Sequence, residues 1–162
     1  MPVHDRTGFE QHYAGQPRWE IGRPQRALLA VADRITGSVL DSGCGTGGER
    51  PLLHQSGSEG QGIDVLAEPI TLAKQKATER GLTATFLVMG ALALKELPEV
   101  FDSVIDRGLF HVFSDAEWWR GGRGEWGYSR LAETCTSRSC GYSASACTAP
   151  EVGAYIRTTF CG

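Results

Sequence analysis

The glycine-rich segment at residues 39–47, Val-Leu-Asp-Ser-Gly-Cys-Gly-Thr-Gly, constrains the fold more than any other part of the chain. The short apolar stretch at 38–40 predicts a buried strand, and the glycines predict a tight loop that lets the backbone approach a ligand. In open parallel sheets, ligands bind in the crevice beyond the carboxyl ends of the strands. The segment therefore predicts the first strand and the ligand loop of an α/β protein.

Segments of helical and strand character alternate through the first 119 residues. Apolar spacings of three and four predict helices over 24–36 and 67–80, and short apolar runs bounded by turn residues predict strands. We expect further strands at 62–65, 85–89 and 101–105, and further helices at 49–55 and from 114 onward. This alternation predicts a Rossmann-like, doubly wound parallel sheet.

Residues 120–162 differ sharply in composition from the rest of the chain. From residue 121 onward, the only Val, Ile, Leu, Met or Phe residues are Leu131, Val152, Ile156 and Phe160. A segment with so few apolar side chains cannot readily offset the entropy of ordering its backbone. We therefore expect a folded part at 1–119 and a poorly ordered tail at 120–162, so that the first four strands are present and the later ones are missing.

The five cysteines do not form a recognisable metal site. Cys135, Cys140, Cys147 and Cys161 cluster in the tail, but they contain no Cys-x-x-Cys pair, and no histidine follows His111. These spacings match no common zinc pattern, so we expect no bound metal.

Charge and hydropathy argue against binding to nucleic acid and against insertion in a membrane. The chain has 162 residues and a formal net charge of −3, with no basic stripe of the kind that binds nucleic acid. It contains no apolar run of about 18 residues, so we expect no membrane span. The N-terminus lacks the apolar core of a secretory signal. We expect a cytoplasmic monomer.

Asp41 and Asp64 limit the ligand that the loop can hold. Asp64 lies about 20 residues after the first loop glycine, where a carboxylate accepts hydrogen bonds from ribose hydroxyls. The glycines also fit the G-x-G-x-x-G pattern of dinucleotide binding, but Asp41 would face an anionic pyrophosphate. A ligand with an ammonium and a sulfonium suits this acid better. A glycine turn without a ligand and a nicotinamide or flavin enzyme remain as alternatives.

Three segments carry a resemblance to a known family. Residues 39–47 resemble the first motif of class I S-adenosylmethionine-dependent methyltransferases. Tyr13 and residues 17–25 resemble the N-terminal lead of small-molecule methyltransferases related to the thiopurine methyltransferase group, and residues 101–111 resemble their fourth strand and following loop. The resemblance implies a methyltransferase domain whose N-terminal part is 1–119, S-adenosylmethionine as cofactor and a small-molecule methyl acceptor.

The resemblance also assigns roles in cofactor binding. Asp41, Gly43 and Gly45 would hold the methionine end, and Asp64 would bind the ribose. Val65 and Leu66 would flank the adenine. Each role follows from the position of the residue in a family motif.

Two further assignments have a structural alternative. Trp19 would pack on the cofactor, although buried tryptophans commonly anchor a core. Asp106 would supply backbone contacts beside the sulfonium, although it could instead cap a turn or helix.

The third strand departs from the family pattern at its end. Gly90 stands where the family usually has an acid that hydrogen-bonds the adenine amino group. Losing that acid would cost on the order of 1 kcal/mol of binding free energy. Backbone groups of Gly90 and Ala91 would still contribute to cofactor binding.

No catalytic residue is assigned. Methyl transfer is an in-line displacement in which the protein mainly aligns the reactants and excludes water. His111 and Asp106 are the candidates for a catalytic role, but a single histidine in an apolar loop more often has a structural role.

The tail is compatible with a shifted reading frame. The family continues with a helix and a Leu-x-Pro-Gly-Gly motif, which is absent after residue 120. With suitable codons, residues 128–136 read two bases later give Leu-Ala-Pro-Gly-Gly-Asp-Leu-His. We therefore interpret about 120–162 as translated out of frame.

Three functions follow from these residues. The favoured one is methyl transfer to a small molecule by a truncated enzyme. The second is an inactive remnant that binds the cofactor, and the third is an NAD-dependent oxidoreductase.

Overall fold

The structure of the chain is a computed structural model that describes residues 6–15, 17, 20–48, 60–99, 101–107, 109, 143–149 and 152–159. Its helical elements are α1 (Arg6–Tyr13), α2 (Arg26–Leu29), the 3-10 helix η1 (Ala32–Arg34), α4 (Ala67–Glu79) and the 3-10 helix η2 (Ala91–Glu96). Its strands are β1 (Val39–Ser42), β2 (Gly60–Asp64), β3 (Thr85–Val88), β4 (Ser103–Arg107), β5 (Ser143–Ala149) and β6 (Val152–Thr159).

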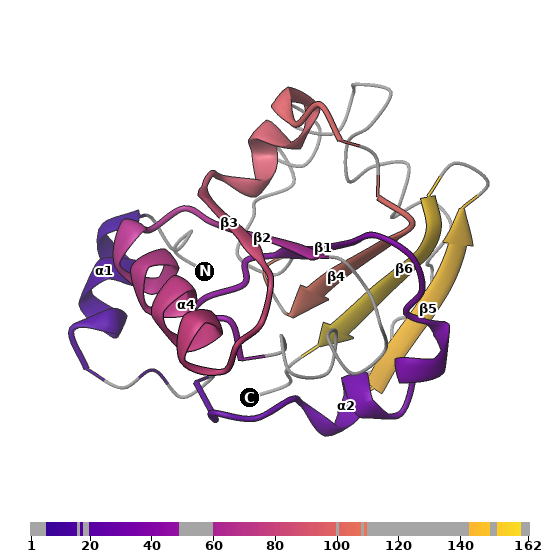
Figure 1. Cartoon of the computed structure of the whole chain (residues 1–162), viewed down its shortest axis with the longest axis horizontal. Helices are drawn as coiled ribbons and strands as arrows, with labels where there is room; N and C mark the ends of the chain where they lie inside the picture. Colours follow the sequence, from indigo (N-terminus) through magenta and orange to yellow (C-terminus); the bar gives the residue numbers. More distant parts are fainter. Residues whose placement is uncertain are drawn as a thin grey trace.

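The strands form one sheet with the order β3-β2-β1-β4-β6-β5 (Figure 1). Every neighbouring pair is parallel except β5 and β6, which are antiparallel. In the centre of the sheet, Asp41 pairs with Gly62 on one side and with Ile105 on the other. The parallel sheet predicted from the sequence is confirmed, and it brings the carboxyl ends of β1, β2 and β4 to one edge.

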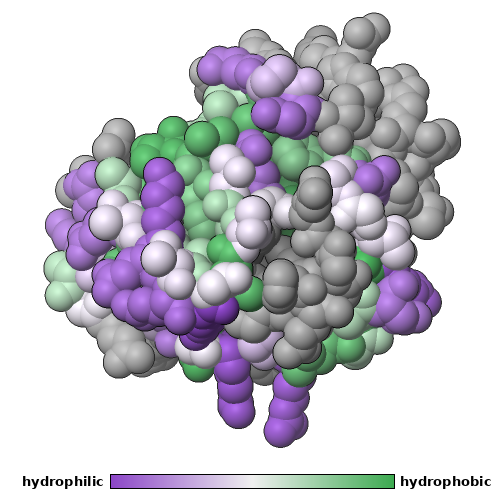
Figure 2. Space-filling model, in the orientation of Figure 1, coloured by the Kyte–Doolittle hydropathy of each residue, from purple (hydrophilic) through white to green (hydrophobic). Residues whose placement is uncertain are grey.

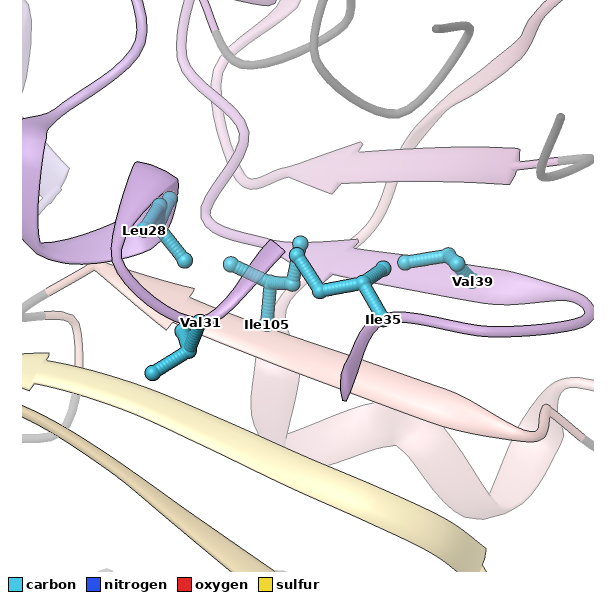
Figure 3. Packing of buried hydrophobic residues seen from close by; sticks show 5 residues of the cluster. All are labelled: Leu28, Val31, Ile35, Val39 and Ile105. Atoms are coloured by element: carbon cyan, nitrogen blue, oxygen red, sulfur yellow. The ribbon is translucent and has the colours of Figure 1, made fainter. Parts of the chain in front are cut away.

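One face of the sheet is covered by α2, η1 and α4. Leu28, Val31 and Ile35 pack against Val39 and Ile105, so the α2–η1 segment lies on β1 and β4 (Figure 3). Farther along the same face, α4 contributes Ile70, Ala73 and Ala77 to a cluster with Cys44 and Phe86. Burial of these apolar side chains holds the helices on the sheet.

The opposite face is covered by η2. Leu40, Ile63 and Val104 alternate with the side chains of the first face, and they form a cluster with Ala91 at the start of η2. Packing on both faces makes the central strands buried, as expected for a doubly wound parallel sheet. The predicted fold class is therefore confirmed.

The expectation that no strand follows the fourth was wrong. The hairpin of β5 and β6 extends the sheet, with β6 pairing parallel to β4 at Ile105 and Ile156. An unpaired edge of β4 would leave backbone N–H and C=O groups without partners, and β6 satisfies them. Val152 and Ile156, two of the few aliphatic residues in the tail, lie in this strand. Residues 120–142 lie outside the described residues.

Several element boundaries differ from the sequence prediction. The helix predicted over 24–36 divides into α2 and η1, because Val31 adopts φ −125° and ψ 15°. Its β-branched side chain has low helix propensity, which favours this break. The strand predicted at 101–105 begins at Ser103, and neither α1 nor η2 was expected. The helices predicted at 49–55 and from 114 lie outside the described residues.

Hydrogen bonds at the amino ends of β1 and β4 form what we term the amino-edge clasp, made of Thr36, Ser38, Asp102 and Ser103. The Ser38 backbone N–H donates to Asp102 Oδ2 at 2.8 Å, and the Ser38 hydroxyl donates to the same oxygen at 2.9 Å. The Ser103 hydroxyl donates to the Thr36 carbonyl at 2.9 Å. The clasp fixes the strands at the edge opposite the glycine loop.

Candidate cofactor site

The glycine loop turns sharply directly after β1. Gly43, Gly45 and Gly47 have φ angles of 71°, 51° and 74°, a region that residues with a side chain rarely adopt. The N–H groups of Gly43 and Cys44 both donate to the Ile63 carbonyl at 2.9 Å. The loop is therefore fixed to the end of β2, and the predicted ligand loop forms at the carboxyl edge of the sheet.

Gly62 allows the loop to pack tightly against its neighbours. A Cβ atom at this position would lie 2.7 Å from Phe86 Cδ1 and 2.9 Å from Cys44 Sγ. Cys44 and Phe86 fill this space under α4, and both are buried. The sequence prediction did not assign this role to Gly62, because the contact depends on two residues distant in the chain.

Asp64 connects the end of β2 to the loop. Its Oδ2 accepts a hydrogen bond from the Gly45 N–H at 3.1 Å, and its Oδ1 accepts one from the Leu66 N–H at 3.0 Å. The structure thus brings Asp64 beside the loop, as the spacing predicted, and gives it a structural contact as well.

Glu20 is a site residue that the sequence prediction did not identify. Its Oε1 accepts a hydrogen bond from the Thr46 N–H at 3.2 Å, and its Oε2 accepts one from the Thr46 hydroxyl. Glu20 lies in the N-terminal lead, directly after Trp19 in the sequence. No local pattern marks this contact, because it joins residues that are 26 positions apart.

The backbone N–H groups of residues 43–47 all have acceptors within the protein. The N–H groups of 43–47 donate to the Ile63 carbonyl, Asp64, Glu20 and the Cys44 carbonyl. Asp41 is fully buried at the end of β1, two residues before the loop. A pyrophosphate needs free N–H donors and no nearby carboxylates, whereas a cationic ligand benefits from these acids. The geometry disfavours a dinucleotide site and fits an ammonium or sulfonium.

Asp106 ends its strand in a turn. It is fully buried, pairs with Ser42 in the sheet, and accepts a hydrogen bond on Oδ1 from the Leu109 N–H at 2.9 Å. This turn places the Leu109 side chain against Gly43, where a Cβ atom would lie 3.0 Å from Leu109 Cδ2. The hydrogen bond to Leu109 therefore supports the alternative that Asp106 caps a turn. Asp106 also borders the glycine loop, because Leu109 contacts Gly43.

Apolar residues lie at the carboxyl ends of β2 and β3. Leu66 is buried at the start of α4, and Ala91 is buried at the start of η2. Val88, which pairs with Asp64, is 53% exposed, and the sequence prediction did not include it. Figure 2 shows apolar surface over β3 between α4 and η2. Val65 and Gly90 are half-buried beside these residues, so the predicted adenine-binding residues come together.

Two predicted residues cannot be placed. Trp19 and His111 lie outside the described residues. Within the part of the chain that the structure describes, no group of three or more His, Cys, Asp or Glu side chains could hold a metal ion. The described helices include none that is long and apolar enough to cross a membrane.

Comparison with known proteins identifies the family. The methyltransferase domain family matches residues 39–123, which begin at β1 and contain the glycine loop. The chain belongs to the methyltransferase family, in its class I branch. The family match therefore agrees with the loop geometry, and the resemblance based on residues 39–47 is confirmed.

Two curated relatives show how similar the chain is to known methyltransferases in sequence. The chain is 36% identical over 114 residues to 2-heptyl-1-hydroxyquinolin-4(1H)-one methyltransferase from Mycobacteroides abscessus, covering 64% of this chain and 50% of the relative. It is 32% identical over 118 residues to demethylmenaquinone methyltransferase from Thermus thermophilus, covering 72% of this chain and 52% of the relative. The methyltransferase chain thus spans about half the length of the curated relatives it matches.

A solved structure supports the fold. A protein studied for the conversion of a disulfide bond into a thioacetal group during echinomycin biosynthesis superposes with a TM-score of 0.65. It is 40% identical and covers 70% of this methyltransferase chain and 52% of its own. The shared part is therefore again about half of the similar protein.

Proposed function

We propose that this methyltransferase binds S-adenosylmethionine at the glycine loop and transfers the methyl group to a small-molecule acceptor. The observation that carries the proposal is the loop at 43–47, whose backbone N–H groups all have acceptors within the protein. With Asp41 and Asp64 at its sides, the loop offers carboxyl oxygens rather than hydrogen-bond donors. Such an environment stabilises a ligand that carries a sulfonium and an ammonium.

Different residues at the carboxyl edge would bind different parts of the cofactor. Asp41, with the backbone of Gly43 and Gly45, would hold the methionine end, and Asp64 would accept hydrogen bonds from the ribose. The adenine would lie among apolar and backbone groups of Val65, Leu66, Gly90 and Ala91, and it would be bordered by Val88. Trp19 and Asp106 would complete the site from the lead and from the end of β4.

The chemistry requires little of the side chains. When bound, S-adenosylmethionine supplies an activated methyl group, and its transfer depends on alignment and exclusion of water more than on a strong base. Asp106 already accepts the Leu109 N–H, which supports a positioning role over a catalytic one. We assign no general base, and His111 stays a candidate.

The relatives support a small-molecule acceptor. The two curated relatives are named for a hydroxyquinolone and for demethylmenaquinone, both small organic molecules. We infer an acceptor of this size class, with its accepting atom open among oxygen, sulfur, nitrogen and a metalloid. A narrower relation to the thiopurine methyltransferase group stays a prediction from residues 17–25. We also propose a cytoplasmic monomer that binds neither nucleic acid nor membrane.

Transfer of a labelled methyl group tests the proposal. The full chain is incubated with methyl-tritiated S-adenosylmethionine and with hydroxyquinolones, demethylated quinones, thiols and amines. We expect label in at least one acceptor, and at least tenfold less with Asp41→Asn, because the variant replaces one of the carboxyl oxygens beneath the loop with an amide NH2. The exposed Glu99→Gln serves as the charge control. No label in any acceptor with wild-type protein would contradict the proposed activity.

A second candidate function is cofactor binding without turnover. It is favoured by one observation, that the chain spans about half the length of its curated relatives. In that case the wild-type protein binds S-adenosylmethionine with a measurable affinity and labels no acceptor. Transfer to any acceptor above a protein-free control would eliminate this candidate.

We propose further that about 120–162 arose from a shifted reading frame. The family match ends at residue 123, close to the point where the apolar content falls. Sequencing the source gene tests this directly. The proposal expects a restored Leu-x-Pro-Gly-Gly motif in the other frame, whereas the same in-frame tail in close relatives would contradict it.

A further inference from the structure

The N-terminal lead contacts the glycine loop and α4 through one cluster of side chains. Glu20 accepts from the N–H and the hydroxyl of Thr46, and Lys76 donates to the Thr46 hydroxyl oxygen. Lys76 Nζ also lies 3.9 Å from Glu20 Oε2, which forms an ion pair. We term Glu20, Thr46 and Lys76 the lead latch, because they join three segments that are distant in the sequence.

The lead latch is partly shielded from solvent, so its hydrogen bonds and ion pair contribute to the stability of the docked lead. The Glu20 side chain is 10% exposed, the Lys76 side chain is 35% exposed, and Thr46 is buried. Hydrogen bonds to charged groups are roughly twice as strong as neutral ones, and partial burial reduces screening by water and salt. An exposed surface ion pair would contribute much less.

The lead latch also determines part of the loop conformation. Thr46 lies between Gly45 and Gly47, which have φ angles of 51° and 74°. Asp64 holds the Gly45 N–H from the β2 side, and Glu20 holds the Thr46 N–H from the lead side. In the observed loop, the acceptor of the Thr46 N–H therefore comes from the lead.

We propose that Glu20 is a positioning residue that couples docking of the N-terminal lead to binding of the cofactor at the glycine loop. By linkage, if a docked lead favours the bound cofactor, then a bound cofactor must favour the docked lead to the same extent. The inference rests on the proposed function for the identity of the cofactor. It goes beyond that function by adding Glu20 to Asp41 and Asp64 beside the loop and by assigning a regulatory contact to the lead.

Graded substitution of Glu20 gives the first test, with calorimetric titration of the full chain with S-adenosylmethionine. Glu20→Ala removes both acceptor oxygens, and we expect affinity to fall about tenfold. Glu20→Gln retains one oxygen, so we expect a smaller loss, about threefold. Lys76→Met leaves Glu20 in place without its ion-pair partner, and we expect a loss similar to that of Glu20→Gln. Glu99→Gln and Lys74→Met, both at exposed positions, are the matched controls.

Limited proteolysis gives a second readout that a purely structural role would not change. Trypsin can cleave the lead after Arg18, and mass spectrometry quantifies that product. In wild-type protein, we expect saturating S-adenosylmethionine to slow this cleavage several-fold. In Glu20→Ala, we expect faster cleavage without cofactor and no protection at cofactor concentrations that saturate the variant. Urea unfolding of each variant confirms that it is folded before the comparison is made.

The outcomes separate the two proposals. If the wild type binds no S-adenosylmethionine, the proposed function fails, and with it the coupling. If the wild type binds it, and folded Glu20→Ala and Lys76→Met bind equally well with cofactor still protecting Arg18, the coupling alone is wrong. Weaker binding together with lost protection in these variants, and neither in the controls, supports the coupling.

Discussion

The two edges of the sheet use the same hydrogen-bond chemistry in different surroundings. At the carboxyl edge, Asp64 accepts the Gly45 N–H, and at the amino edge, Asp102 accepts the Ser38 N–H. Asp102 is exposed, whereas the glycine loop lies between the fully buried Asp41 and a nearly buried Glu20. Solvent therefore screens Asp102 more than it screens Asp41 and Glu20. The comparison indicates that carboxyl groups at the glycine loop are more buried than the one in the clasp.

Glycine substitutions at the two edges should have the largest effects on stability. In Gly62→Ala, the new Cβ atom meets Phe86 and Cys44, so we expect the free energy of unfolding to fall by about 2–3 kcal/mol. In Gly37→Ala, the new Cβ atom would lie 2.1 Å from Oδ2 and 2.8 Å from Cβ of Asp102, and the residue would keep its positive φ, so we expect a loss of about 2–3 kcal/mol together with displacement of Asp102 from the clasp. Urea denaturation measures both. Gly90→Ala is the neutral control, since its Cβ meets nothing within 4 Å, and losses no larger than that of the control would contradict the packing account.

Carboxylate neutralisation should affect ligand binding at one edge only. Asp64→Asn removes the charge and weakens the contact to the Gly45 N–H, so we expect S-adenosylmethionine to bind about tenfold more weakly, a loss of about 1.4 kcal/mol. Asp102→Asn makes the same chemical change at the opposite edge and should leave the affinity unchanged. Calorimetric titration measures both, and similar losses would mean that the amino edge influences the site.

A substitution at Gly90 should strengthen binding. Its φ of −77° suits any residue, and the open space around its Cβ leaves room for a carboxylate. Since the family usually has an acid here, we expect Gly90→Asp to bind S-adenosylmethionine about fivefold more tightly, near 1 kcal/mol. Gly90→Ala should not change the affinity. If Gly90→Asp binds no better, the adenine does not lie at this position.

The smallest expected effect is the pH dependence of the amino-edge clasp. Hydrogen bonds from the backbone and the side chain of Ser38 hold the pKa of Asp102 below its ordinary value. A lowered folded-state pKa contributes stability that is complete above the ordinary carboxyl pKa, about 3.9, and is lost as the pH falls through the folded value. Ser38→Ala should therefore destabilise the protein slightly at about pH 5 and less at about pH 3. A constant difference in urea midpoint would show that Asp102 does not titrate through this contact.

Local patterns explain why most of the carboxyl edge could be predicted. The glycines of the loop, the position of Asp64 and the apolar spacing of α4 are encoded within short segments, and each appears where expected. Long-range contacts explain what was missed. Glu20 contacts Thr46 only through the fold, and Val88 is recognisable as a site residue only once it pairs with Asp64.

The hairpin of β5 and β6 was missed for a different reason. Composition indicates how much apolar surface a segment can bury, and the tail has few apolar side chains to bury. The segment instead completes backbone hydrogen bonds at the edge of β4, which depend little on side-chain type. Sequence composition alone could not reveal this, because the open edge exists only in the folded sheet.

Calorimetric titration of the full chain with S-adenosylmethionine and with NAD tests the central claim most directly. The account predicts saturable binding of S-adenosylmethionine and no measurable binding of NAD at the same concentrations, because the N–H groups of residues 43–47 already have acceptors and carboxyl groups lie beside them. Binding of NAD without binding of S-adenosylmethionine would contradict it.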